Sequence, residues 1–572
     1  MSDTTFPATA RRLPNLFDLA ACAVILAMLV YVASIARATF GPLDAPNATA
    51  VSLDPSELPV YAVRTTLRMF AALACSVLFT FTYATWAAKS RRAGLVLVPV
   101  LDVLQSVPIL GFLTFTVVFF MNLFPGRVLG AELAAIFAIF TSQAWNMAFS
   151  LYQSLKTLPA DLDEASRAFQ QSPWQRFWRL EVPFAMPGLV WNTMMSMSGG
   201  WFFVVASEAI SVGDTTWKLP GIGSYVALAL EQRNIGAVFW AIGAMLVVIL
   251  LYDQLLFRPL VAWSAKFRFE MTPGASAEDP WVLAALRRTR FLRWFVDRAA
   301  LLFNNASGLR LSRPRPARRI SARASRRWDL LLVGVLALVS AWALWVVVRY
   351  MATELAWSDI RQAVLLGLLT LLRVVTMIAL ATLVWVPVGV WLGLRPAWAR
   401  RAQPVAQFLA AFPANLFFPF FVVAIVRFSL NPDIWLTPLM VLGTQWYILF
   451  NVVAGATAFP GDLQEAANSF HVGGWLWWRQ VILPGVFPYY VTGAITASGG
   501  SWNAAIVAEV VTWGNTRLSA HGLGAYIADA SAAGHTPQVV LGVAVMATYV
   551  IGFNRLLWRP LYAYATRRLT FG

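Results

Sequence analysis

Long apolar stretches recur along this chain, and most charged residues lie in the gaps between them. A segment of about 20 apolar residues is long enough to cross the hydrocarbon core of a bilayer as a helix. Of the 572 residues, 59% are hydrophobic and only 12% are charged, whereas a soluble domain carries about 25% charged residues. The sequence therefore predicts an all-α polytopic membrane protein.

Twelve membrane helices are predicted, in two sets of six. We expect the first set near 16–36, 67–88, 94–121, 132–155, 184–212 and 236–257, and the second near 329–350, 361–394, 402–427, 434–455, 486–512 and 538–557. The first apolar run is longer than the signal-peptide core of about 7–15 residues, so we interpret it as an uncleaved helix. These segments divide the chain into a first repeat, 1–263, a basic linker, 264–328, and a second repeat, 329–572.

The two sets are copies of one another. Glu164 and Glu465 are separated by 301 residues, and further upstream Arg68 and Arg373 are separated by 305. Other pairs at the 301-residue separation are Pro159 and Pro460, Pro183 and Pro484, Trp201 and Trp502, Glu208 and Glu509, and Gly221 and Gly522. Repetition in a fixed register indicates a duplicated structural unit. Six crossings return the chain to the same side, which predicts parallel repeats related by an axis along the membrane normal.

The charge distribution predicts the orientation. The net charge is +17, and Lys and Arg concentrate in cytoplasmic segments. We therefore expect both termini and the linker on the cytoplasmic side. A nucleic-acid partner would require a folded basic surface, and the sequence shows no sign of one. Within the linker, residues 281–303 mix apolar and basic residues, which fits either an amphipathic helix against membrane lipid or a solvated basic linker.

Each repeat contains one polar loop of the same pattern, near 160–183 and near 461–484. The second reads Glu465-Ala466-Ala467 and closes with Pro484, and the first begins with Glu164 and closes with Pro183. Both loops follow a fourth helix and are therefore predicted to face the cytoplasm. A duplicated loop suits a partner with two-fold symmetry, because each copy can bind one protomer.

This loop resembles the EAA loop of ATP-binding-cassette importer permeases. The resemblance implies the type I importer fold and a coupling helix that inserts into a groove of a cytoplasmic ATPase. That family usually has Gly six residues after the Glu, where this chain has Gln170 and His471. The residues that the resemblance assigns to ATPase coupling are Glu164, Ala165, Phe169, Pro183, Glu465, Ala466, Ala467, Phe470 and Pro484.

The chain lacks the G-x-x-x-x-G-K-[ST] phosphate loop, so ATP binding is expected on a separate chain. The resemblance implies two ATPase subunits, which use ATP and Mg²⁺, and a periplasmic or lipid-anchored solute-binding protein. This chain is expected to bind no cofactor or metal and to be no enzyme. Its three histidines show no H-E-x-x-H spacing, and no catalytic residues are predicted.

A second resemblance concerns the solute. "SGGSWNAAIVAEVV" followed by "GLGAYI", and "GGWFFVVASEAI" with "GIGSYV" in the first repeat, are similar to the nitrate/taurine/sulfonate importer permeases. The resemblance implies import of a small anion, of the nitrate, sulfonate/taurine or bicarbonate class, across a bacterial inner membrane by alternating access.

Several residues are candidates for the pathway or gate. Glu208 and Glu509 lie near the outer ends of the fifth helices, and an acid inside a membrane is a functional-site hypothesis. The alternative is a carboxylate that caps backbone amides or pairs with a base. Arg68 and Arg373 could attract an anion or anchor helix ends. The remaining candidates, which interhelical hydrogen bonding or packing explains equally well, are Trp201, Trp502, Gln143 and Asn146.

Three other interpretations remain open from the sequence. One is an importer permease of the same type for another solute. The second is a secondary transporter that works without an ATPase, which the paired loops argue against. The third is a membrane scaffold or sensor that uses the basic linker.

Overall fold

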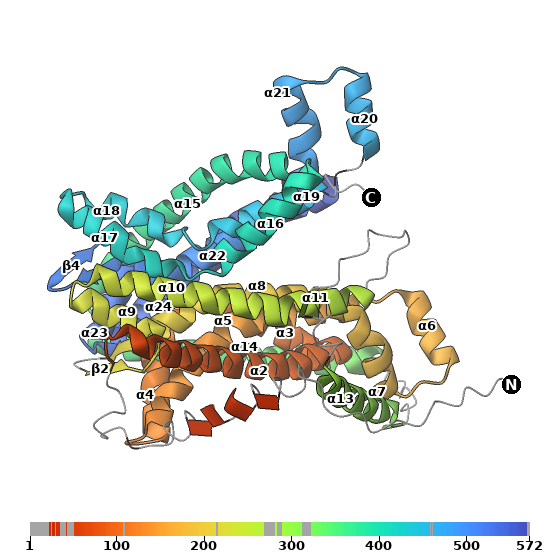
Figure 1. Cartoon of the computed structure of the whole chain (residues 1–572), viewed down its shortest axis with the longest axis horizontal. Helices are drawn as coiled ribbons and strands as arrows, with labels where there is room; N and C mark the ends of the chain where they lie inside the picture. The colour runs from red at the N-terminus through yellow and green to blue at the C-terminus, as the bar shows by residue number, and fades with distance from the viewer. Residues whose placement is uncertain are drawn as a thin grey trace. The chain divides into compact units, whose positions relative to one another are not determined.

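The computed structural model describes residues 51–106, 109–212, 215–267, 281–282, 289–311, 322–457, 459 and 461–568, together with a few residues between 22 and 42. The chain forms two compact units, which we describe separately. The larger unit comprises Pro42–Tyr152, Asn192–Leu250 and Ile320–Gly572, and the smaller comprises Met1–Gly41, Gln153–Trp191 and Leu251–Arg319. The described residues are helical except for connecting segments and two β-hairpins (Figure 1).

The same order of elements occurs twice, except that one long helix of the first repeat, Val128–Lys156, corresponds to a divided segment in the second. The first repeat has α2 (Leu58–Lys89), α3 (Arg91–Ser106), α4 (Leu113–Leu123), α5 (Val128–Lys156), α6 (Ala160–Ala168), α7 (Pro173–Arg176), α8 (Val182–Glu208), β1 (Ala209–Val212), β2 (Thr215–Lys218), α9 (Ile222–Glu231), α10 (Ile235–Tyr252) and α11 (Arg258–Ser264). The second has α15 (Trp357–Gly393), α16 (Pro396–Ala411), α17 (Phe418–Arg427), α18 (Pro432–Trp435), α19 (Gln445–Thr457), α20 (Gly461–Ser469), α21 (Gly474–Trp477), α22 (Leu483–Ala508), β3 (Val510–Trp513), β4 (Thr516–Ser519), α23 (Leu523–Ala532), α24 (Thr536–Phe553) and α25 (Arg559–Arg568). Between them lie α13 (Arg290–Gly308) and α14 (Ala322–Glu354).

Four π-helical turns mark equivalent points of the two repeats. They cover Phe177–Glu181 and Trp478–Ile482, then Asp253–Phe257 and Asn554–Trp558. In each, the residue just before a proline donates its N–H to the carbonyl five residues back, as Val182 does to Phe177 and Leu483 to Trp478. A proline ring clashes with the carbonyl four residues earlier, and a wider turn relieves that clash.

Three predicted helices are broken, and the single-helix prediction for them is wrong. The segments Val405–Ala411 and Ala414–Arg427 meet at 83°, and Pro432–Met440 meets Gln445–Thr457 at 44°. Helix 94–121 is likewise divided into α3, a 3₁₀ turn at Ile109–Phe112, and α4. The 83° bend falls at Pro413, because a proline disfavours helical backbone in the residue before it.

The fifth helices end earlier than predicted. The sequence predicted helices to 212 and 512, but α8 ends at Glu208 and α22 at Ala508. Each is followed by an antiparallel hairpin, with Ala209 opposite Lys218 and Val510 opposite Ser519. The β-branched residues that follow these helices favour strands, which simple apolar counting does not distinguish from helix.

Seven helices of the described residues are long and apolar enough to cross a membrane, or up to nine if each bent pair is one span. The chain is thus a multi-pass, all-α membrane protein with a duplicated unit. The count of twelve stays a prediction, and the helix predicted at 16–36 lies largely outside the described residues.

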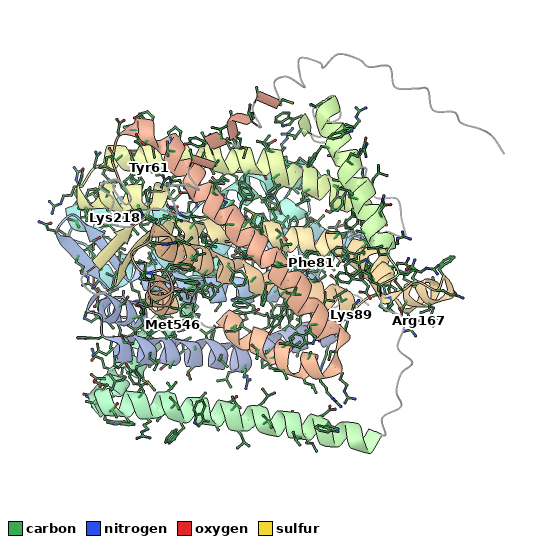
Figure 2. The ribbon with its side chains drawn as sticks, turned by 90° about the horizontal axis from the view of Figure 1, so that it is seen from below. Tyr61, Phe81, Lys89, Arg167, Lys218 and Met546 are labelled. Atoms are coloured by element: carbon green, nitrogen blue, oxygen red, sulfur yellow. The ribbon has the colours of Figure 1, made fainter. Side chains whose placement is uncertain are left out.

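In the larger unit, α15, α16, α19 and α22 run side by side, while α20 and α21 project beyond their ends (Figure 1). Small residues let these helices approach closely: a Cβ at Gly493 would lie 2.6 Å from the Tyr447 carbonyl oxygen, and one at Gly389 2.7 Å from Val452. Such contacts are typical of helix packing in membranes. Figure 2 shows Tyr61 and Lys218 at one end of this unit and Lys89 at the other end of α2.

Candidate functional site

A buried cluster of charges joins four elements of the first repeat. The guanidinium of Arg68 on α2 donates to both oxygens of Glu132 on α5, at 2.5 and 2.7 Å, and to Glu208 at the end of α8, at 2.6 Å. Arg68 is 3% exposed and Glu208 is fully buried. Burying ions is costly unless they are paired and hydrogen-bonded, and this bidentate geometry supplies both requirements.

The carboxylate of Glu208 also binds the start of α9. It accepts hydrogen bonds from the Gly223 N–H at 2.6 Å and from the Thr65 hydroxyl at 2.7 Å, and that hydroxyl accepts the Ile222 N–H at 3.0 Å. The first N–H groups of a helix lack partners within the helix, and its N-terminus favours negative charge. Glu208 therefore caps α9 while it pairs with Arg68.

The glycines of "GIG" and "GLG" make this capping possible. A Cβ at Gly221 would lie 2.4 Å from the Glu208 carboxylate, and one at Gly522 would lie 2.2 Å from Glu509. Gly223 faces the Val205 carbonyl oxygen at 2.2 Å in the same test. Only glycine lets the backbone approach the carboxylate this closely.

The second repeat has an equivalent but more open cluster. Arg373 donates to Glu509 at 3.2 Å and to Asp433 at 2.8 Å. Thr370 donates to Glu509 at 2.9 Å and accepts the Leu523 N–H at 2.9 Å. Unlike its buried counterpart Glu132, the Asp433 side chain is 35% exposed and also binds His521. The second cluster thus reaches the surface where the first is sealed.

Sequence reasoning found Arg68, Glu208 and their counterparts but missed Glu132 and Asp433. These two residues are also separated by 301, so a search for acids at that separation would have paired them. The pair was missed because only identical residues were compared between the repeats, and Glu132 corresponds to an Asp. The contacts support the capping and pairing alternative for Glu208 and Glu509, and a pathway role for these residues stays a prediction.

The other pathway candidates lie in helix contacts. Gln143 is buried against Met69 and Ser76 of α2, at 3.2 and 3.3 Å. Asn146 donates to Ser196 of α8 at 3.0 Å. Trp201 and Trp502 are among the largest fully buried side chains, and Trp502 stacks on Tyr549. The candidates therefore hold neighbouring helices together in this conformation.

Two asparagines of the second repeat bond to the first repeat. The Asn503 side chain accepts the Ile109 N–H at 2.7 Å, and the Asn415 side chain donates to the Phe202 carbonyl oxygen at 3.1 Å. Phe202 is the counterpart of Asn503 at the 301-residue separation. Equivalent positions on the two sides of the repeat interface are therefore both hydrogen-bonded.

The polar loops form short helices with exposed aromatic ends. Phe169 follows α6 and Phe470 follows α20, and their side chains are 79% and 80% exposed. Glu164, Ala165, Glu465 and Ala466 are also exposed, whereas Ser166 and Ala467 are buried. The buried third position requires a small residue, and the exposed positions are free to contact a partner.

The backbone conformation of Gln170 and His471 explains why related loops have glycine at this position. Both have left-handed backbone, with φ of 50° and 51°. In α6 the Gln171 N–H bonds the Ser166 carbonyl and the Gln170 N–H bonds the Arg167 carbonyl, which is the Schellman arrangement at a helix C-terminus. The turn forms here with a non-glycine residue in the left-handed conformation, which costs about 1–2 kcal/mol.

The interiors of the two loops differ. In the first, Asp163 pairs with Arg167 and Arg176, and Arg176 also pairs with Glu181. The second loop has Gln464, Trp477 and Ile482 at the positions of Asp163, Arg176 and Glu181. Charges thus link α6 to the π turn in the first loop, and the three equivalent positions of the second loop carry no charge.

The helix α13 packs on the first loop, within the smaller unit (Figure 1). The Trp174 indole donates to the Ala306 carbonyl oxygen at 2.7 Å, and the Gln175 amide donates to that of Gly308 at 2.7 Å. Both acceptors belong to the last turn of α13, where carbonyls lack α-helical partners within the helix. Trp475, the counterpart of Trp174, is 73% exposed.

The sequence of this chain is similar to those of several known transport proteins. The glycine betaine/proline betaine transport system permease protein ProW of Salmonella typhimurium is 28% identical over 33% of this chain and 50% of its own length. The bicarbonate transport system permease protein CmpB of Synechococcus elongatus is 28% identical over 33% and 64%. The nitrate import permease protein NrtB of Leptolyngbya laminosa is 26% identical over 30% and 58%. The chain thus spans about half to two thirds of the length of these relatives.

A family model matches twice, over residues 77–258 and 385–559, once in each repeat. It describes a transport component, the "binding-protein-dependent transport system inner membrane component". The two matches together cover more than half of the chain, and they include both polar loops and both charge clusters except for the α2 and α15 residues. This chain therefore belongs to the family of inner membrane components of binding-protein-dependent transport systems, with the family's domain present twice.

Proposed function

We propose that this chain is the membrane subunit of an ATP-driven importer in a bacterial inner membrane, with both termini in the cytoplasm. The observation that carries the proposal is the pair of loops at equivalent positions, each presenting an exposed Phe and Glu. An exposed aromatic residue suits a pocket on a protein partner. Two such loops on one chain suit two ATPase subunits.

The proposed cycle takes its energy from the partners. Two cytoplasmic ATPase subunits bind ATP and Mg²⁺, and their closure moves α6 and α20 together with the helices that follow Pro183 and Pro484. The two repeats then rock between outward and inward access. A solute-binding protein outside the membrane delivers the solute, and membrane lipid surrounds the helices.

The proposed solute is a small anion. Relatives that carry bicarbonate or nitrate in their names support this class. A betaine, which is a zwitterion, is the second candidate because permeases named for betaines match at similar identity. Uptake of labelled bicarbonate, nitrate and glycine betaine by cells with and without this chain would separate the two classes.

The decisive experiment is purification of the tagged chain from its native host in mild detergent, followed by mass spectrometry. We expect two copies of a P-loop ATPase per chain, lost when Glu164 and Glu465 are both changed to Lys. Glu57→Lys, at an exposed site outside the loops, is the matched control and should retain the ATPases. A pure chain without ATPase, under conditions that preserve other complexes, would instead favour a secondary transporter.

A further inference from the structure

A cavity of about 430 Å³ lies where the second repeat begins, beside the N-terminal turns of α15. Its lining includes Gln362 and Leu366 of α15, Tyr526 and Asp529 of α23, and His521 and His535. Two of the chain's three histidines thus border this one cavity. Its volume is within the range of ligand sites, about 300–1,000 Å³.

The equivalent place in the first repeat is filled by the chain itself. Tyr61, near the start of α2 (Figure 2), is the counterpart of Leu366, and Tyr225 is the counterpart of Tyr526. The rings of Tyr61 and Tyr225 lie 6.2 Å apart. The Tyr225 hydroxyl donates to the Leu53 carbonyl oxygen at 3.1 Å, and the Tyr61 hydroxyl accepts the Ser52 N–H at 3.0 Å.

That covering segment is a short extended strand of chain ahead of α2. It ends at Asp54, whose carboxylate accepts the Ser56 N–H at 2.9 Å and so caps the 3₁₀ turn at Pro55–Glu57. The Ser56 hydrogen bonds hold the pKa of Asp54 below its usual range. The first repeat thus supplies both a peptide carbonyl and an aromatic ring to Tyr225.

The second repeat lacks this cover because its helix starts earlier. The residue that corresponds to Ser52 is Trp357, the first residue of α15. The residues that could cover Tyr526 in an extended conformation are therefore part of α15. In addition, Leu366 is smaller than its counterpart Tyr61 and fills less of the space. The Tyr526 hydroxyl is buried and has no hydrogen-bond partner among the described residues. A buried hydroxyl without a partner is destabilising.

The charged groups around the cavity are already engaged. Asp529 pairs with Arg517, and His521 binds Asp433 through its ring and its backbone N–H. The cavity therefore needs one hydrogen-bond acceptor for Tyr526 and an apolar body against Leu366 and Ala530. A peptide segment offers both, whereas a free anion would meet the carboxylate of Asp529.

We propose that this cavity binds an extended peptide segment of the solute-binding protein, with a backbone carbonyl accepting the Tyr526 hydroxyl as Leu53 does for Tyr225. The inference rests on the proposed function. The cavity and the second polar loop lie at opposite ends of α22, whose 26 residues span about 39 Å at 1.5 Å per residue. The site is thus on the side away from the ATPases, where a solute-binding protein docks.

The test places a photocrosslinking residue, p-benzoylphenylalanine, at Gln362 on the exposed rim in the native host. We expect crosslinks to one contiguous segment of one secreted solute-binding protein. Leu366→Tyr introduces the residue that the first repeat has at this position, and its ring fills the cavity. Crosslinking should then fall at least about tenfold, equivalent to about 1.4 kcal/mol. Solute uptake should fall as well. Leu365→Tyr, at a site 55% exposed, should change neither.

A second variant guards against a folding defect. Tyr526→Phe removes the unpaired hydroxyl, so the melting temperature should rise while crosslinking weakens; a merely structural tyrosine would not separate the two effects. Crosslinks confined to lipid or to this chain, crosslinks unaffected by Leu366→Tyr, or competition by free solute alone would each overturn the inference. ATPases that still copurify in those cases would leave the proposed function intact.

Discussion

Arg68 lies between two carboxylates in a sealed cluster, and its counterpart Arg373 lies in a partly open one. Arg68 and Glu132 have 3% and 8% exposed side chains, against 12% for Arg373 and 35% for Asp433. Water can partly solvate the charges of the second cluster but not those of the first. The arginine–carboxylate ion pairs are therefore expected to contribute differently to the stability of the two repeats.

We predict that Arg68→Met destabilises the protein by about 3–5 kcal/mol, because it leaves two buried carboxylates without a cation. Arg373→Met should cost less, about 1–3 kcal/mol, because Asp433 keeps its contact with His521 and with solvent. Unfolding titrations with SDS would measure both variants. Equal losses would show that exposure does not set the energy of these clusters.

Gln170→Gly should stabilise the end of α6, because the left-handed backbone at this position costs a non-glycine residue about 1–2 kcal/mol. Hydrogen exchange of residues 166–171 should become slower. Phe169→Gly is the matched control: Phe169 has φ of −78°, so glycine there should speed exchange. Slower exchange in both variants would contradict the backbone explanation.

At the residue scale, the sequence indicated the loop glutamates, the loop prolines and the buried acids. It did not indicate that Glu208 caps α9, because capping depends on the hairpin that returns Gly223 to the carboxylate. Nor did it indicate Glu132, which lies 64 residues from Arg68. Contacts of this kind form only once four elements are in place.

At the element scale, α13 packs on the first loop. Its last turn accepts two hydrogen bonds from α7, and Phe303 meets the Trp178 ring at 5.5 Å. The sequence suggested an amphipathic helix in this part of the linker without a docking site. The structure supplies that site, and the contact of its other face with membrane lipid stays a prediction.

We predict that Trp174→Ala detaches α13, so that hydrogen exchange across residues 290–308 becomes faster. Trp475→Ala, at the equivalent position of the second repeat, should leave stability unchanged because that side chain is mostly exposed. Exchange mass spectrometry of both variants would check this. Unchanged exchange in the Trp174 variant would mean that other contacts hold the helix.

Element boundaries were the weakest part of the sequence prediction. Apolar content alone joined α8 to β1 and α22 to β3, and it joined α16 to α17 across a sharp bend. The loop helices α6 and α20 each begin directly after a proline, Pro159 or Pro460. Apolar patterning detects burial in lipid, whereas the 83° bend depends on one residue, Pro413.

At the scale of the whole molecule, the two repeats are joined by the linker and by hydrogen bonds of Asn415 and Asn503. If the chain is divided between α13 and α14 and the halves are coexpressed, we expect them to copurify. Asn415→Ala with Asn503→Ala should weaken that association, by about 0.6–2 kcal/mol for each bond. Asn146→Ala, which removes a bond inside the first repeat, is the control, and an equal loss there would argue against an interface role.

The covalent fusion of the repeats has a genetic consequence. In a permease built from two identical chains, every mutation is present on both sides of the axis, so a change tolerated on only one side is eliminated. Here each codon specifies one side alone, and the two sides can drift under separate selection. The sealed and open charge clusters, and the filled and empty sites at Tyr225 and Tyr526, are the kind of divergence that becomes possible when each half has its own codons.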